Sequence, residues 1–237
     1  MAGEALAFEH RAALTALTGL TEDTLRALFE SLRGASAIEI RNVLMELVPT
    51  LAETYGDMAA ALAMDFYESM REEADVRRAF SVEPAALPGS ARYEALVRWG
   101  VDPLFSANPE PLAVLSRVSG GLQRIVTDVS RDTVALNSVR DPSAAGWKRV
   151  ARSDGCAFCK MLASNGAVYR ESSARFASHD WCHCSAAPAF DGGRTASVMQ
   201  YKASARRSSD PETQAARNAT LGNYLGEDYA ANLATPA

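Results

Sequence analysis

The chain has 237 residues, 48% of them hydrophobic and 22% charged, an ordinary globular balance that supplies enough apolar side chains for a packed core. No stretch approaches the roughly 18 uninterrupted apolar residues of a membrane-spanning helix, and residues 1–10 lack the basic and apolar regions of a signal peptide. We therefore expect one large domain or two smaller ones, no membrane partner, and a protein of the cytoplasm or of a particle assembled there.

The net charge of −5 is distributed unevenly along the chain. Residues 1–146 carry a net charge of −8, residues 147–209 carry +6, and residues 210–237 carry −3. A positive segment of this kind can face nucleic acid or an acidic partner surface. Its basic residues are scattered and form no run, so we favour pairing with the acidic part of the same chain, or simple solvation.

Residues 1–142 have the pattern of helices separated by turns. Thr21, followed by Glu22 and Asp23, predicts the N-cap of a helix with acidic residues in its first turn. Pro49 suits the first turn of the next long helix. Apolar residues recur along that helix at three- and four-residue steps and predict a stripe that faces the core. They are Leu51, Tyr55, Met58, Leu62, Phe66 and Met70.

A short helix is expected from Ser90 to Trp99, and a long one over Pro111–Val139. Apolar residues of the long helix fall on one face, which we expect to be buried within its own bundle in preference to binding a partner helix. They are Leu115, Val118, Leu122, Ile125, Val129 and Leu136. Gly120 and Gly121 each cost about 1 kcal/mol in a helix interior, so a kink or break there competes closely with a continuous helix.

The hydrophobic periodicity changes near Asp141-Pro142. Beyond it the segments "WKRV" and "GAVYR" resemble short strands, and turn dipeptides lie between them. We expect a mainly α protein with a helical region over 1–142, a small α/β module over 143–193, and a C-terminal tail over 194–237 that is partly helical or disordered.

All four cysteines and two of the three histidines lie in the small module. A C-x2-C pair directly follows a turn, and an H-x-x-C-x-C cluster comes twenty residues later. Thiolate and imidazole are the donors that zinc selects, and four of them complete a tetrahedron. The candidate donors are Cys156, Cys159, His179, Cys182, His183 and Cys184.

We expect one structural zinc ion, Zn²⁺, on both residues of the C-x2-C pair and on two or three of His179, Cys182 and Cys184. His183 is the expected bystander, because adjacent residues seldom point at the same ion. Two disulfides would need an oxidising compartment, and a thioredoxin-like redox pair would leave the second cluster unexplained. His10, the remaining histidine, is predicted to be a surface residue.

No enzymatic activity is expected. Three cysteines and a fourth donor would saturate the ion, whereas a catalytic zinc keeps one position open for water. The chain has no H-E-x-x-H, no deaminase signature and no G-x-S-x-G. A zinc-dependent hydrolase or nuclease is therefore the weakest interpretation, and a nucleic-acid-binding protein that grips DNA with the positive module ranks above it.

The run "GWKRVARSDGCAFCKMLASNGAVYRESSARFASHDWCHCSAAPAF" resembles the MuF-like minor head proteins of tailed bacteriophages, especially those infecting actinobacteria. In that family a C-x-x-C, a Gly-x-Val-Tyr and an H-x-x-C-x-C before a proline occur together. The stretch "YGDMAAALAMDFYESMREEADVRRAF" is also similar to the N-terminal part of the group. The likeness covers about two thirds of the chain, and its specificity lies in the combined motif.

The resemblance implies a structural virion protein present in few copies, inside the capsid near the portal, which is assembled in the host cytoplasm and aids head assembly and genome packaging or delivery. Its implied partners are the portal or major capsid protein, with packaged DNA as a further partner of the basic module. The family's metal positions fall on Cys156, Cys159, His179, Cys182 and Cys184. Some relatives carry a fused protease or toxin enzyme, which this chain lacks.

A module of about 45 residues buries too little surface for a core of its own, so zinc would supply its folding free energy. We therefore expect Cys156→Ser or Cys159→Ser to unfold the module and to leave the helical region largely intact. The helical region is expected to contact protein partners through faces built on Leu115, Leu122 and Leu136, or through the apolar stripe over 51–70.

Overall fold

The computed structural model describes residues 2–151, 157–164, 166–170, 176, 178, 180–192 and 194–195. Within these residues the chain is mainly helical, with a small α/β region after the long helices, and the predicted fold class is confirmed. The elements are α1 (Ala2–Ser31), α2 (Ala37–Glu73), α3 (Ser90–Gly100), the short 3₁₀-helix η1 (Asp102–Phe105), α4 (Pro111–Arg140), β1 (Trp147–Val150), α5 (Ala157–Ser164), β2 (Ala167–Val168), β3 (Ser185–Pro188) and β4 (Arg194–Thr195).

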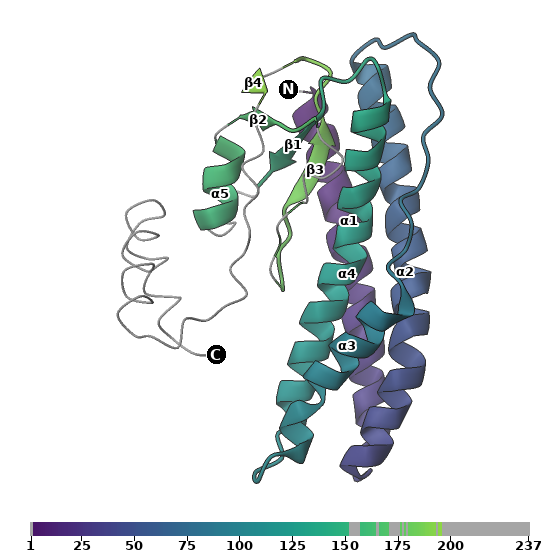
Figure 1. Ribbon diagram of the computed structural model, residues 1–237, viewed down its shortest axis with the longest axis vertical. Helices are drawn as coiled ribbons and strands as arrows, with labels where there is room; N and C mark the ends of the chain where they lie inside the picture. Colours follow the sequence, from purple (N-terminus) through teal and green to yellow (C-terminus); the bar gives the residue numbers. More distant parts are fainter. Residues whose placement is uncertain are drawn as a thin grey trace.

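The three long helices α1, α2 and α4 run side by side along the length of the molecule, and α3 crosses the lower half of the bundle (Figure 1). Each long helix packs against the other two, and α3 packs against α2 and α4. The strands and α5 lie beside the upper half of the bundle (Figure 1). This arrangement gives α4 neighbours on several sides.

Two predicted helix starts are wrong. Thr21 lies inside α1, where its hydroxyl donates to the carbonyl of Leu17 and so caps nothing. Helix α2 begins after Ser36, whose hydroxyl and backbone form a reciprocal capping box with Glu39. Pro49 is in the interior of α2. The packing of long helices therefore outweighs these local signals.

The buried face of α2 also differs from the predicted stripe. Met58 is 49% exposed, whereas the buried positions on this stretch are mostly small residues. A Cβ added to Gly56 would lie 2.9 Å from a methyl group of Leu87 and 3.6 Å from one of Val129 in α4. Small residues are needed here because neighbouring segments approach the backbone of α2 closely. The buried residues of this stretch are Ala52, Gly56, Ala59, Ala60, Ala63, Phe66 and Tyr67.

Helix α4 is continuous through Gly120 and Gly121, and both glycines are contact positions. A Cβ on Gly121 would lie 2.2 Å from a methyl group of Leu96 in α3, and one on Gly120 would lie 2.8 Å from the indole nitrogen of Trp181. The glycine pair thus admits close neighbours to α4 on both sides. Leu122 is fully buried, so the prediction that it contacts a protein partner is wrong.

The small α/β region packs directly against the helices. Strands β1 and β3 are antiparallel, from Trp147 opposite Pro188 to Val150 opposite Ser185, and β3 lies against α4. Strand β2 pairs in parallel with β4. Helix residues share one buried cluster with this region, so the described part of 143–193 has no core separate from the helices. The cluster contains Ala7, Ala63, Phe66, Tyr67, Val82, Val134, Trp147, Cys159, Phe176, Cys182, Cys184, Ala186 and Ala187.

A buried ion pair stabilises the junction between the helices and the strands. Arg71 of α2 donates to the carboxylate of Asp141, which directly follows α4 and also accepts from the hydroxyl of Tyr67 at 3.3 Å. The second guanidinium nitrogen of Arg71 donates to the carbonyl of Arg78 in the segment that leaves α2.

In the described part of the chain, no helix is both long and apolar enough to span a membrane.

The prediction that His10 lies at the surface is wrong. Its ring stacks on Phe66 with the centroids 4.4 Å apart, and its Nε2 atom is 3.0 Å from the hydroxyl of Ser130. The ring also bonds the backbone of Leu62, so it joins α1 to both α2 and α4. Burial lowers the pKa of His10 to about 4, and the folded protein therefore contains the neutral imidazole at neutral pH.

His10 should make the stability of the protein depend on pH. An unfolded histidine titrates near 6.5, so the unfolded chain takes up this proton first as the pH falls. The stabilisation by neutral His10 is complete above about pH 6.5 and is lost as the pH falls towards about 4, which lowers the free energy of unfolding by up to about 3 kcal/mol.

The measurement is urea unfolding of the wild type and of His10→Gln between pH 7 and about 4. Glutamine can still bond Ser130 but does not titrate, so its stability should fall less steeply. The carboxylates contribute equally to both proteins and cancel in the difference. Equal pH dependence in both proteins would contradict the conclusion that protonation of His10 destabilises the fold.

Candidate metal centre

The fold brings three of the predicted metal ligands together. Cys159 comes from α5, and Cys182 and Cys184 come from the segment that leads into β3. Their sulfur atoms lie within 4.8 Å of one another, with 3.6 Å between those of Cys159 and Cys182, and all three side chains are buried. Cys156 and His179 lie outside the described residues. His183 is described and is not part of this group of described residues; its bystander role stays a prediction.

The spacing of the three sulfur atoms fits a single thiolate-bound ion. A zinc–sulfur bond is about 2.3 Å long, so sulfur atoms at two corners of a tetrahedron are about 3.8 Å apart. The 3.6 Å between the sulfur atoms of Cys159 and Cys182 is close to this value, and no separation in the group exceeds 4.8 Å. The three thiols can therefore hold a metal ion, with one further position for a donor.

Two buried arginines place positive charge beside the thiols. Arg149 of β1 donates to the sulfur of Cys159 at 3.7 Å. The ring of Phe176 lies against both guanidinium groups, with Arg149 Cζ at 3.6 Å and Arg131 Cζ at 4.6 Å from its centroid. The hydrogen bond with Cys159 and the charge of Arg131 lower the pKa of the Cys182 thiol. Hydrogen bonds with Cys159 and Cys182 raise the pKa of the Cys184 thiol, so these surroundings favour a thiolate at Cys182, the form that binds a metal.

Helix α4 holds the cysteine segment through its backbone carbonyls. Arg131 Nη2 donates to the carbonyls of Cys182 at 2.7 Å and Cys184 at 2.8 Å, and its Nε donates to Cys184 at 2.9 Å. The remaining nitrogen, Nη1, donates to Asp128 at 2.9 Å. Gln123 donates to the carbonyl of Cys182 at 3.2 Å.

The same region of α4 also fixes the two residues that precede Cys182. Gln123 accepts from the backbone N–H of Trp181 at 3.0 Å, and Arg124 pairs with Asp180 at 3.2 Å. Trp181 has a left-handed backbone with φ of 62° and packs over Gly120. The polar residues of this face recur at steps of three and four along the helix, a signal that the periodicity of apolar residues does not reveal.

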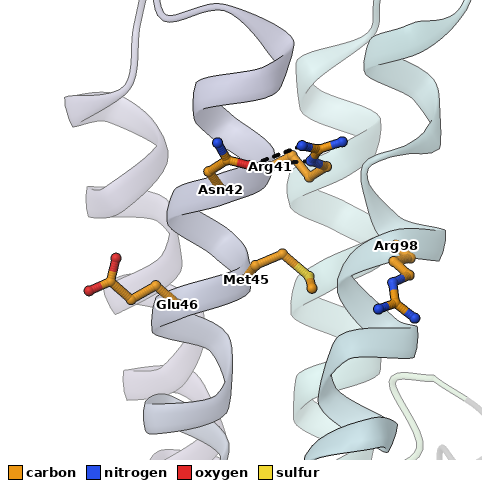
Figure 2. Close-up of a pocket in the computed structure, with 5 residues that line it drawn as sticks. All are labelled: Arg41, Asn42, Met45, Glu46 and Arg98. Atoms are coloured by element: carbon orange, nitrogen blue, oxygen red, sulfur yellow. Dashed lines mark hydrogen bonds between the residues drawn. The ribbon is translucent and has the colours of Figure 1, made fainter.

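A hollow elsewhere on the bundle has different chemistry. It lies between α2 and α3 and is lined by Arg41, Asn42, Met45, Glu46 and Arg98. Figure 2 shows that Arg41 bonds Asn42, while Glu46 points away from Met45 and Arg98. Among the described residues of this lining, the only carboxylate is thus turned away from the arginines, and none is a cysteine. The thiol cluster remains the stronger candidate for a functional site.

Cobalt binding tests the thiol cluster directly. Adding Co²⁺ to the reduced, metal-free full-length protein should produce the near-ultraviolet absorption of cobalt–thiolate bonds. Cys182→Ser removes one ligand and should weaken cobalt binding by more than about 100-fold, since loss of an outer-shell partner alone typically costs about 10- to 100-fold. Ser185→Ala is the matched control, because Ser185 is buried in the same segment and its hydroxyl has no hydrogen-bond partner among the described residues. A cobalt spectrum unchanged in Cys182→Ser would exclude this cysteine as a ligand.

Comparison with known proteins supports a viral origin. Residues 1–217 match the model of the family described as VG15 protein, a family of phage gene products. A search of curated proteins and a search of solved structures each found no match. The family match indicates a phage protein and does not single out the MuF-like minor head group. Because the match covers most of its length, the chain belongs to the VG15 protein family.

Proposed function

We propose that this protein is a structural minor head protein of a tailed phage, located inside the capsid near the portal, where it aids head assembly and genome packaging or delivery. The observation that supports this proposal is the buried three-thiol cluster, held by a helical bundle in a chain of a phage protein family. The resemblance to MuF-like minor head proteins rests on the same cysteine motif. The proposed location near the portal comes from this resemblance.

The proposed metal is zinc, bound by Cys159, Cys182 and Cys184 with Cys156 or His179 as the fourth donor. Three buried thiols suit zinc better than hard cations, which prefer oxygen ligands. Zinc bound by four protein donors would contribute folding free energy. It would have no open position for a substrate, so we propose a structural role without enzymatic activity.

The exposed apolar residues of the bundle offer a surface for a protein partner. Phe105 and Leu112 are 52% and 81% exposed, and both lie in or beside the turn between η1 and α4. This turn is at the end of the bundle away from β1 and α5 (Figure 1). Large side chains left in water favour burial against a partner. We propose that this end contacts the portal or the major capsid protein.

Contacts within the protein favour a protein partner over packaged DNA. Of the two basic residues in β1, Lys148 pairs with Asp191 at 3.3 Å and Arg149 is buried beside the thiols. Both positive charges therefore have partners within the same chain, that of Lys148 in a pair at the surface. DNA remains the alternative partner for the positive charge over 147–209, and its binding would weaken steeply with salt.

The zinc proposal predicts one zinc ion per chain. Elemental analysis of protein purified without added metal should give this ratio, and a thiol reagent should react with the cysteines only after the zinc is removed by a chelator. The zinc-bound protein should cleave DNA, peptide and ester substrates no faster than buffer does. Protein that contains no metal and four freely reactive thiols would contradict the proposal.

The proposed location inside the capsid predicts that the protein is incorporated into phage heads. Full-length protein produced together with portal and major capsid proteins should be found in the purified procapsids by mass spectrometry. Leu112→Asp should reduce its amount several-fold, because a charge at this position opposes burial against a partner.

Phe8→Asp is the matched control for the incorporation experiment. Phe8 is 62% exposed, and it lies in the first turns of α1, at the other end of the bundle. Its substitution should leave incorporation unchanged. A protein absent from procapsids would contradict the proposed location, and equal effects of the two substitutions would contradict the proposed contact surface.

A further inference from the structure

Arg131 is buried on α4, and most of its hydrogen bonds go to the backbone of the cysteine segment. Its side chain is 1% exposed, and three of its bonds reach the carbonyls of Cys182 and Cys184. Its single carboxylate partner, Asp128, is shared with Arg92 at 2.8 Å and with the hydroxyl of Ser178. A buried guanidinium is costly unless its donors are satisfied, so its position depends on this segment being in place.

These bonds fix the backbone at two thiol-bearing residues at once. A rigid guanidinium that bonds two carbonyls holds Cys182 and Cys184 at a set separation. Gln123 adds a bond to Cys182 and one to Trp181, so the chain is held on both sides of the first cysteine. The left-handed backbone of Trp181, which costs about 1–2 kcal/mol in a residue other than glycine, is kept by the same contacts.

We propose that α4 is the template of the metal centre: Arg131 and Gln123 position the thiols before the metal binds, and metal binding in turn stabilises the whole helical bundle. The inference rests on the metal centre of the proposed function and goes beyond it, because it assigns metal affinity to positioning residues outside the cysteine motif. It also reverses the expectation that loss of the metal leaves the helices largely intact.

The shared core explains how metal binding can stabilise the helices. The three cysteines belong to the buried cluster that also contains Phe66 of α2 and Val134 of α4. A metal that holds the thiols together therefore holds part of the packing surface of these helices. A ligand that binds only the folded state stabilises every element whose folding is coupled to the site. Arg131 is the most direct link between that site and α4.

The test compares full-length wild type with Arg131→Lys at one fixed pH. Lysine keeps the charge but cannot bond two carbonyls as a planar fork. Zinc affinity, measured by competition with a coloured chelator, should fall by about 10- to 100-fold, as for other residues that orient metal ligands. The matched control is Arg140→Lys on the same helix, where the arginine is half exposed and pairs with Glu83; its affinity should equal that of wild type.

A second readout follows the helices themselves. Urea unfolding monitored by far-ultraviolet circular dichroism should shift to higher urea when zinc is added to the wild type and to Arg140→Lys. The shift should be much smaller in Arg131→Lys at the same zinc concentration. If that variant does not fold, Gln123→Met is the second variant. It removes the two hydrogen bonds of Gln123, leaves the charge of Arg131 in place, and should weaken zinc binding about tenfold.

The outcomes separate the inference from the proposed metal centre. If the wild type binds zinc and the folded Arg131→Lys and Gln123→Met variants bind it equally well, α4 does not position the thiols. If zinc binds the wild type but leaves the unfolding of its helices unchanged, the coupling to the bundle is wrong. If the wild type binds no zinc, the metal centre is wrong and the template falls with it.

Discussion

The bonds from Arg131 to the carbonyls of Cys182 and Cys184 are the contact on which the rest of the structure depends. Without them the buried guanidinium of Arg131 would keep only its bond to Asp128, and the carbonyls of Cys182 and Cys184 would lose their bonds from this side chain. Each side therefore needs the other to fold. This mutual requirement explains how a segment with few large apolar residues is held tightly against a helical bundle.

Helix α4 can fill this central position because its faces differ in chemistry. One face is apolar and packs into the bundle through residues such as Val118, Leu122 and Ile125. Another carries Gln123 and Arg131, which bond the cysteine segment. Gly120 and Gly121 cost helix propensity, and the close contacts that they permit with Trp181 and Leu96 offset that cost.

The shared core also bears on the proposed role in the phage head. The bundle and the thiol cluster share one buried core, with the thiols buried and an apolar turn at Phe105 and Leu112 left exposed. A structural component of a capsid needs a fixed shape and a contact surface more than an open cavity. This combination suits the structural role proposed above.

The sequence by itself determined the mainly helical class and the cysteine motif. For residues 111–139 it left two alternatives, a continuous helix or one with a kink or break at the glycine pair. Helical periodicity and metal-ligand spacing are local, so the residues alone express them. Three thiols meeting at one point was predictable because a C-x2-C pair and an H-x-x-C-x-C cluster together are typical of one metal site. The tertiary structure decided everything that depends on a distant neighbour. Thr21 and Pro49 lie inside helices because packing over the length of α1 and α2 outweighs local start signals. His10 and Arg131 look like ordinary surface residues in the sequence, and they are buried only because partners more than 50 positions away, such as Ser130 and Cys184, satisfy their hydrogen bonds.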